Sequence, residues 1–320
     1  MKKVLLATTA FAALGFASAT YAQEAPISFS GSAEFGFGGE YGDGNPDEED
    51  FLSDVELDVA FTGSADFGIS FSASAEIDAD GLTNGGDAEF SGFSIVFSQE
   101  SFGTFSFGDT DGAFDSALQS VDSAGLNDSA DFYLSGDSGL DGTGDDGDRV
   151  FNWDFDFGLA AFHASFEEND GSEPFEDDVD SDDSPIFGFG LDGDFAGWNF
   201  GIAYQFGEED DEGTDAFGVS AAGALGPIDA KFLYTFVDTT GEDAASNFDV
   251  SLVYNFDPFQ FGGNFTFQEE NDDVGDDAVG YGFWTNYDLG GGLNFTAAAG
   301  TIDGDTGNQS QFDFGFSLSF

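Results

Sequence analysis

The sequence predicts an all-β fold, a transmembrane antiparallel up-and-down β-barrel, on three observations. Apolar residues recur at every second position, the connections alternate between short turns and long acidic loops, and the N-terminus has the features of an export signal. The 320 residues include 43 Phe, 47 Gly, 65 Asp and Glu, and no Cys. Phe residues spread over the whole chain suit a sheet with one apolar face better than a compact globule.

Residues 1–22 are expected to be a signal peptide. Lys2 and Lys3 precede an apolar stretch over 4–16, and small residues follow up to Ala22. A positive start, a short apolar segment and a small-residue cleavage site are typical of exported proteins. The apolar segment is shorter than the roughly 20 residues that a membrane-spanning helix needs. We therefore expect residues 23–320 to form the barrel.

The period-two pattern predicts about sixteen strands. Val55, Leu57, Val59 and Phe61, for example, alternate with acidic residues. A strand places these apolar side chains on one face, whereas a helix would scatter them around its circumference. Along the chain, the pattern predicts strands at 26–41, 51–63, 66–79, 88–98, 102–109, 149–156, 159–168, 185–193, 198–207, 214–223, 229–238, 246–256, 259–268, 277–288, 293–302 and 309–320.

The predicted connections are of two kinds, and they alternate. Short turns are expected at 63–65, 99–101, 156–158, 193–196, 224–227, 257–258 and 290–292. Long acidic loops are expected at 42–50, 80–87, 110–148, 169–184, 208–213, 239–245, 269–276 and 303–308. Outer-membrane barrels have short turns on one rim and longer loops on the other, and a soluble sandwich has no reason for this alternation.

The apolar stripe could face lipid or a second apolar sheet, so a β-sandwich is the alternative fold. The export signal, the rhythm of the turns and the even strand number favour the barrel. Its Phe stripe would face lipid and its Ser, Asn, Gln, Asp and Glu stripe would face water inside. Closure pairs every backbone group. Aromatic girdles are then expected near the two membrane interfaces, formed by Tyr41, Trp153, Trp198, Tyr204, Tyr234, Tyr254 and Tyr287.

The acidity of the chain restricts its partners. The formal net charge is −61, with only 4 Lys and Arg. This balance excludes sequence-blind nucleic-acid binding, which needs basic side chains against phosphate, and it disfavours adhesion to anionic headgroups. Cations are therefore the expected partners. The absence of Cys excludes a disulfide framework and thiolate metal sites.

Three segments carry a family resemblance. They are the stretch APISFSG at 25–31, the stretch FGTFSFG at 102–108, and a final strand that ends on Phe320 and places apolar residues at Phe312, Phe314, Phe316 and Leu318. They resemble, in turn, the first strand, the strand before the constriction loop and the C-terminal assembly signal of the general porins of Gram-negative bacteria, especially the alphaproteobacterial type.

The resemblance implies a homotrimer of sixteen-stranded barrels in the outer membrane of a Gram-negative bacterium, in contact with its lipid. Each barrel would be a water-filled channel for passive diffusion of small hydrophilic solutes and ions. It also implies that the segment 110–148 folds into the barrel as a constriction loop. The same segment is the longest gap between predicted strands, and gaps above about 15 residues are usually functional or disordered.

The chain departs from this family in its basic residues. Family members usually carry Arg or Lys on the pore wall opposite an acidic constriction loop. Here Asp109 follows Gly108 where a basic residue is expected, and Asn152 stands where a second Arg is expected after Arg149. Rings of Asp and Glu select for cations, so the sequence predicts a negative lumen and a cation-preferring channel.

The candidate site residues are mostly carboxylates. The predicted pore constriction consists of Asp109, Asp111, Asp115, Asp122, Asp128 and Asp131. The predicted pore wall consists of Asp54, Glu56, Asp58, Glu76, Asp78, Asn152, Asp154, His163, Lys231 and Arg149. A low-dielectric tube lined by one sign of charge concentrates the opposite ion. The alternative is that the acids of 110–148 only solvate a surface loop.

Three of these candidates are basic or titrate near neutral pH. Lys231 is expected to pair with a wall carboxylate and Arg149 to hold the end of the long loop, with ordinary surface ion pairs as the alternative. His163 is the only histidine and faces the lumen by the alternation. No nucleophile motif accompanies it, so no enzymatic activity is expected.

No cofactor is expected, although the acidic loops could hold Ca²⁺ through carboxylate and carbonyl oxygens at unassigned sites. Two other function classes stay open. One is a non-conducting structural or adhesive outer-membrane barrel, which differs in whether 110–148 folds inward and leaves an opening. The other is a secreted acidic Ca²⁺-binding β-protein, which would lack the heat-modifiable gel migration of membrane barrels.

Overall fold

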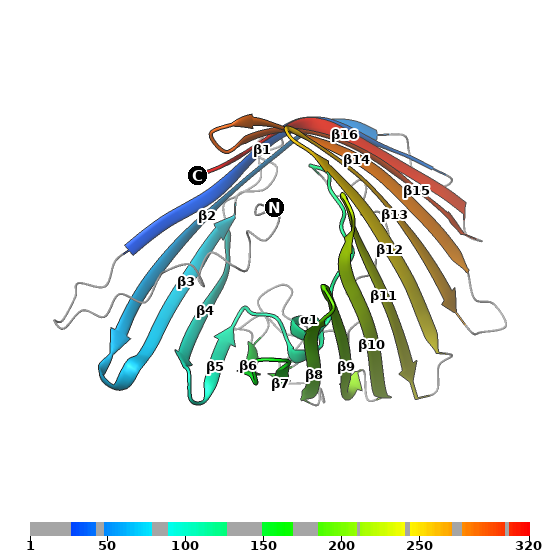
Figure 1. Cartoon of the computed structure of the whole chain (residues 1–320). Helices are drawn as coiled ribbons and strands as arrows, with labels where there is room; N and C mark the ends of the chain where they lie inside the picture. Colours follow the sequence, from blue (N-terminus) through cyan, green and yellow to red (C-terminus); the bar gives the residue numbers. More distant parts are fainter. Residues whose placement is uncertain are drawn as a thin grey trace, which may run out of the picture.

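The computed structural model describes residues 27–42, 48–78, 89–126, 149–168, 185–209, 212–240, 244–270, 277–304 and 307–320. Within them the chain forms sixteen antiparallel strands, each paired with its neighbours in the sequence, in one closed barrel (Figure 1). The predicted fold and strand number are confirmed. The predicted signal peptide lies outside the described residues and stays a prediction.

The strands follow the predicted spans to within a few residues. Their bounds are β1 (Ile27–Gly42), β2 (Glu48–Ala65), β3 (Ile69–Asp78), β4 (Glu89–Gln99), β5 (Gly103–Gly108), β6 (Arg149–Asp156), β7 (Ala161–Glu168), β8 (Ile186–Phe195), β9 (Trp198–Glu209), β10 (Glu212–Leu225), β11 (Ile228–Thr239), β12 (Ala245–Phe256), β13 (Phe259–Glu270), β14 (Ala278–Gly290), β15 (Leu293–Gly304) and β16 (Gly307–Ser319). Two helical turns accompany them, η1 (Asp66–Gly68) and α1 (Ala113–Ala117). None of the described helices is long and apolar enough to cross a membrane.

The barrel closes between the two ends of the chain. β1 pairs with β16 from Ser32 opposite Ser319 to Gly42 opposite Gln309. The C-terminal residue extends this ladder, because Phe320 N donates to Gly31 O at 3.1 Å and Gly31 N donates to Phe320 O at 3.2 Å. Closure removes the unpaired edges that an open sheet would expose to lipid.

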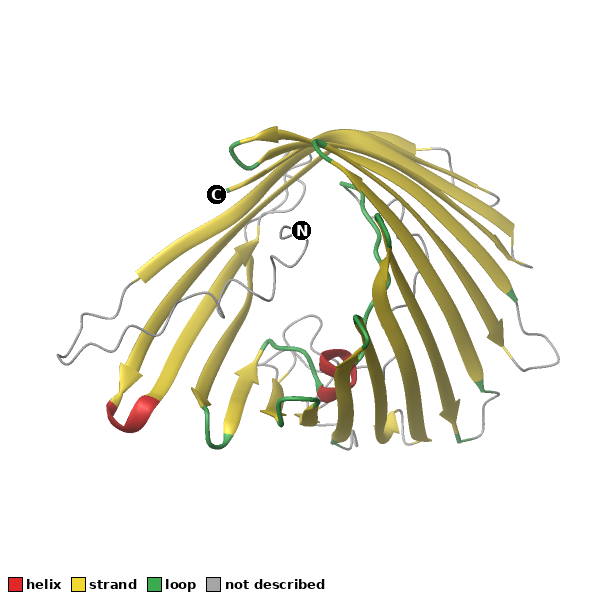
Figure 2. Ribbon diagram, in the orientation of Figure 1, coloured by secondary structure: helices red, strands yellow, loops and turns green. Residues whose placement is uncertain are grey.

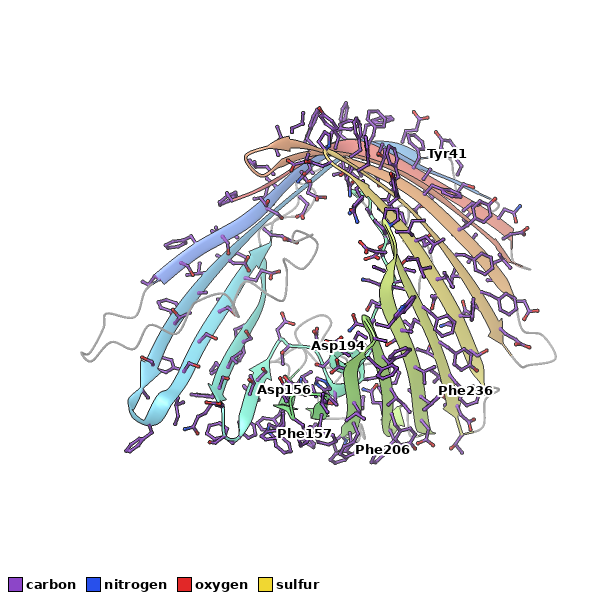
Figure 3. The ribbon with its side chains drawn as sticks, in the orientation of Figure 1. Tyr41, Asp156, Phe157, Asp194, Phe206 and Phe236 are labelled. Carbon is purple, nitrogen blue, oxygen red and sulfur yellow. The ribbon has the colours of Figure 1, made fainter. Side chains whose placement is uncertain are left out.

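The two faces of the wall divide the side chains as the period-two pattern predicts. On β8, Ile186 and the glycines that follow it at alternate positions are buried, whereas Phe187 and Phe189 are exposed on the opposite face. Phe206 and Phe236 point away from the interior (Figure 3). Large apolar side chains therefore cover the outer surface, and the polar stripe faces inward.

Two predicted turns are displaced along the chain. A turn was expected at 63–65, but β2 continues to Ala65 and the chain reverses at η1, where Phe67 and Gly68 have φ of 72° and 74°. Gly63 is extended and lies opposite Phe71, whose ring occupies the space where a Cβ would stand. Likewise the turn expected at 193–196 lies at Ala196 and Gly197, with φ of 55° and 84°.

Five predicted loops are shorter than expected. β9 extends to Glu209 and β10 begins at Glu212, inside the segment expected as a loop at 208–213. Strands also enter the segments 42–50, 239–245, 269–276 and 303–308. Acidic residues do not interrupt backbone pairing at a rim, where both faces of the sheet can meet water. The predicted strands were therefore too short at their loop ends.

Candidate functional site

The residues 109–126, called the strap below, run inside the barrel. β5 ends at Gly108, which has a positive φ of 107°, and Asp109 N donates to Phe93 O at 2.8 Å. The strap then forms α1 and continues along the inner wall (Figure 2). α1 contacts β7, β8 and β9. The described part of the segment 110–148 thus folds inward, as the resemblance implied, whereas 127–148 lies outside the described residues.

Apolar side chains pack the first half of the strap against the wall. We call this cluster the first apolar seat. Phe114, Ala117 and Leu118 are buried against inward-facing residues of four successive strands, namely Ile186, Ala203, Ala216 and Leu233. Phe114 and Ala117 have no exposed surface. The acid-based prediction missed these residues, although apolar side chains in an otherwise acidic loop are a readable signal that the loop packs against something.

The wall forms a groove of small residues beneath α1. A Cβ at Gly190 would collide with the Ala117 side chain, and one at Gly201 would meet the Ala117 carbonyl. A Cβ at Gly188 would collide with Ser165 Oγ and would crowd Ala113. Gly218 similarly leaves room for Leu118. Polar side chains would be expected at these inward positions of a water-filled barrel. Glycine replaces them where the strap approaches the backbone closely.

The far end of the strap has a second apolar seat. Ala124 packs against the inward-facing side chains of Val253, Trp284 and Ala298 on β12, β14 and β15. Leu126 then lies against Gly36 on β1 and Gly315 on β16. The strap therefore crosses the inner wall from β5 past β7–β15 to the strand pair that closes the barrel.

Asp122 is the polar anchor of the strap. Its backbone N donates to Ser251 Oγ at 2.8 Å, and Ser251 Oγ donates to its Oδ2 at 3.3 Å. Lys231 Nζ lies 2.8 Å from its Oδ1. Asn264 Nδ2 donates to its carbonyl at 3.5 Å. The Lys231 partner is thus the strap carboxylate of Asp122, whereas a wall carboxylate was predicted.

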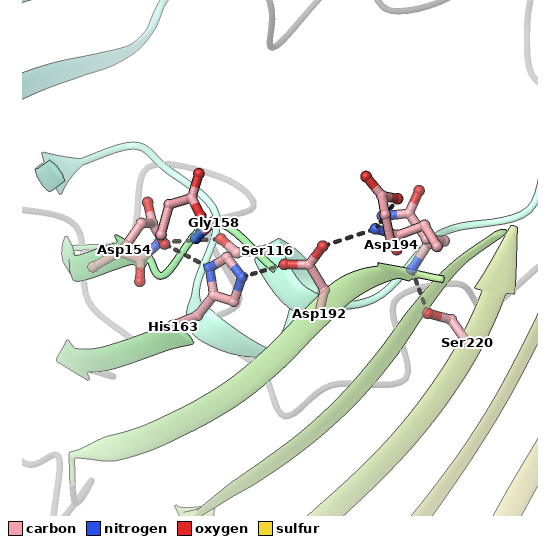
Figure 4. Close-up of polar contacts among 11 residues, drawn as sticks. Ser116, Asp154, Gly158, His163, Asp192, Asp194 and Ser220 are labelled. Carbon is pink, nitrogen blue, oxygen red and sulfur yellow. Dashed lines mark hydrogen bonds and ion pairs between the residues drawn. The ribbon is translucent and has the colours of Figure 1, made fainter. Parts of the chain in front are cut away.

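His163 lies between two carboxylates at the start of the strap (Figure 4). Its Nδ1 is 2.7 Å from Asp154 Oδ1, and its Nε2 is 2.9 Å from Asp192 Oδ1. Carboxylate oxygens only accept hydrogen bonds, so both contacts are satisfied only when each ring nitrogen carries a proton. His163 faces inward as predicted and is 7% exposed.

This cluster reaches the strap through Asn152. Asn152 Nδ2 lies 3.2 Å from Asp154 Oδ1 and donates to Ser116 Oγ on α1 at 3.0 Å. Nearby, Gln119 N donates to Ser220 Oγ at 2.9 Å. Asn152, predicted as a replacement for a basic pore residue, is 3% exposed and holds the strap to the wall.

Glu167 is a buried carboxylate that sequence reasoning did not single out. It is 1% exposed on β7, and it accepts hydrogen bonds from Ser165 Oγ at 2.9 Å and Gln205 Nε2 at 3.2 Å. It lies against Gly112, the residue that precedes the first turn of α1. A carboxylate beside the N-terminal end of a helix is a favourable electrostatic arrangement.

The predicted wall acids come together on β2 and β3. Asp54, Glu56 and Asp58 occupy alternate positions on the inward face of β2, and Glu76 lies opposite Asp58. Glu34 on β1 lies opposite Asp54. Directly opposed like charges repel. This part of the wall is therefore a patch of concentrated negative charge.

Several predicted site residues are not described in full. Asp128 and Asp131 lie outside the described residues, and the side chains of Asp78 and Arg149 are not described. Lys231 is the only Lys or Arg whose side chain the structure describes. Among the described residues, no group of three His, Asp or Glu side chains could hold a metal ion. Calcium binding by the acidic loops stays a prediction.

Comparison with known proteins assigns the chain to a protein family. A family model described as Gram-negative porin matches residues 7–307. The chain belongs to this family. The porin fold is also that of a porin structure refined at 1.8 Å resolution, which is 22% identical, has a TM-score of 0.68, and aligns over 92% of this chain and 100% of that one. A triple mutant of the Rhodopseudomonas blastica porin is 18% identical, with a TM-score of 0.68 and the same coverage.

Sequence searches of curated proteins give no match. Family and fold nevertheless agree, and this porin is an outer-membrane channel protein of Gram-negative bacteria. The predicted family, localisation and channel class are confirmed. Porins as a family are channel proteins and not enzymes.

Proposed function

We propose that this porin is a cation-preferring channel for passive diffusion of small hydrophilic solutes and ions, and that it works as a homotrimer. The observation that carries the cation preference is the pairing of Lys231 with a carboxylate. Its ammonium group lies 2.8 Å from the Asp122 carboxylate, so it adds little net positive charge to the interior. The other described group that can be positive, His163, lies between Asp154 and Asp192.

Acidic groups occur both on the wall and on the strap. Glu34, Asp54, Glu56, Asp58 and Glu76 face inward from β1–β3. On the strap, Asp109, Asp111 and Asp115 precede the neutralised Asp122. A solute that passes between the strap and this wall would pass carboxylates that belong to both. Such a field concentrates cations and gives weak, charge-based selection in a water-filled tube.

Planar-bilayer recording under a KCl gradient tests the proposal. We expect stepwise conductance and a reversal potential whose sign shows that K⁺ permeates more readily than Cl⁻. A reversal potential of the opposite sign would disprove the cation preference and leave the channel intact. An absence of conductance from heat-modifiable, folded protein would instead support a non-conducting structural barrel. Chemical cross-linking of the native protein tests the trimer. If the largest cross-linked species is a monomer or a dimer, the proposed trimer is contradicted.

A further inference from the structure

Asp122 is held to the wall through both of its backbone polar atoms and both carboxylate oxygens. The four contacts come from three successive strands, with Lys231 on β11, Ser251 on β12 and Asn264 on β13. We call these four residues the latch. Contacts in which one partner is charged are stronger than neutral hydrogen bonds and depend more sharply on geometry.

Lys231 has carboxylates of the wall within reach. Asp229 lies two residues away on the same face of β11, and Asp249 on β12 lies opposite Leu233, diagonal to Lys231. Diagonal neighbours in a sheet are within reach of a long side chain. Asp229 accepts a hydrogen bond from Asn255 Nδ2 at 2.8 Å. The Lys231 ammonium lies at Asp122, on the strap, so the ion pair joins two separate parts of the structure.

The latch lies between the two apolar seats. Val121 is the last strap residue that packs against the first seat and Ala124 packs against the second, with Asp122 between them. Apolar contacts are not directional, so they hold the strap against the wall without fixing its register along the wall. The charge-assisted contacts at Asp122 are directional, so they fix the strap at one position along the wall.

We infer that Lys231 is a positioning residue that fixes the strap in the channel through Asp122, and that it is not a source of positive field in the lumen. The inference rests on the proposal that the strap borders the passage. It also changes the role of Asp122, whose carboxylate is turned to the wall and neutralised. Removal of both partners then leaves the net charge of the interior unchanged and releases the strap.

The test compares Asp122→Asn, Lys231→Met, the double variant and the charge swap Asp122→Lys/Lys231→Asp. Strap position is read by disulfide trapping between cysteines introduced at Ala124 and at Ala298, a member of the cluster against which Ala124 packs, in a chain without native Cys. Loss of charge-assisted contacts should slow trapping at least about tenfold in either single variant, and open-channel noise should rise. The double variant should be no worse than the single variants, and the swap should restore trapping.

Ser251→Ala provides a variant without a change of charge. It removes two of the four contacts, so we expect slower trapping and more noise with an unchanged reversal potential. Heat-modifiable migration verifies that each barrel is folded.

Wild-type trapping and noise in both single variants would overturn the latch, as would effects in the double variant that equal the sum of the single effects. Opposite shifts of reversal potential in the single variants, with trapping unchanged, would assign Lys231 to the field. An absence of cation preference in the wild type would disprove the proposed function and leave the trapping result interpretable.

Discussion

His163 Nε2 lies 2.9 Å from Asp192 Oδ1, across the pairing between β7 and β8. With the second contact to Asp154, the imidazole separates two carboxylates that would otherwise face each other over a buried position. His163→Leu should therefore destabilise the barrel. The side chains of Asp154 and Asp192 are 33% and 20% exposed. We expect a loss of roughly 2 kcal/mol, less than the about 3–5 kcal/mol for breaking a fully buried pair.

Urea unfolding of detergent-folded protein measures this loss. A variant that combines His163→Leu with Asp154→Asn and Asp192→Asn removes the repulsion as well and should recover most of the stability. Wild-type stability of His163→Leu alone would show that the contacts contribute nothing.

Phe320 is expected to be required for efficient closure of the barrel. Its deletion removes both backbone hydrogen bonds to Gly31 and leaves the end of β1 unpaired. An unpaired backbone group costs more in lipid than in water, so the fraction of protein that shows heat-modifiable migration should fall. Leu318→Ala on the same strand truncates an outward side chain without removing backbone bonds, and it should assemble nearly as well as the wild type. Equal assembly of the two variants would contradict the prediction.

The strands were largely predictable because each face of a membrane barrel meets a single environment. β6 was predicted to the residue, at 149–156, since Phe151 and Trp153 alternate with polar residues throughout its length. The turn at η1 was not, because Gly63 resembles a turn residue and no local feature shows that Phe67 adopts a positive φ. A glycine indicates either a turn or a close approach, and only the paired strand distinguishes the two.

The acidic wall was predictable and the seat of the strap was not. Alternation alone places Asp54, Glu56 and Asp58 on the inward face. The partners of Asp122 depend instead on which strands the strap passes, and Ser251 lies 129 residues away in the sequence. The alternation pattern of a single sequence does not show which residues of a loop lie against which residues of a distant strand. Wall glycines such as Gly190 were a usable signal only once their inward direction was known.

Phe114→Ala should loosen α1 while the barrel stays folded. Phe114 is fully buried between the strap and the wall, and a Phe-to-Ala change in a packed site costs about 3–5 kcal/mol. Hydrogen exchange at Leu118 N, which donates to Phe114 O at 3.3 Å, reports the opening of α1. We expect exchange to accelerate by at least about a hundredfold. Phe283→Ala is the matched control, because Phe283 faces outward from β14, and it should leave exchange at Leu118 unchanged.

Neutralising the acids of the β2 wall should weaken the cation preference. In the triple variant Asp54→Asn, Glu56→Gln, Asp58→Asn, the interior loses three inward-facing carboxylates, and we expect the K⁺ to Cl⁻ permeability ratio to fall by about half or more. The matched control is Asp215→Asn, Asp238→Asn, Asp303→Asn, which removes three exposed carboxylates from the outer face of β10, β11 and β15. Both variants change the net charge equally, so only the position of the charge differs between them.

Varying the ionic strength in the same recordings distinguishes selection by the electric field of the wall carboxylates from selection by a fixed ion-binding site. The Debye length falls from about 10 Å at 0.1 M salt to about 3 Å at 1 M. A field from wall carboxylates should therefore select cations strongly at low salt, and the difference between the two triple variants should shrink as salt rises. A difference that persists undiminished at 1 M would mean that ions touch the carboxylates directly. If the outer-face variant changed selectivity as much as the β2 variant, the selectivity would depend on total charge and not on the wall.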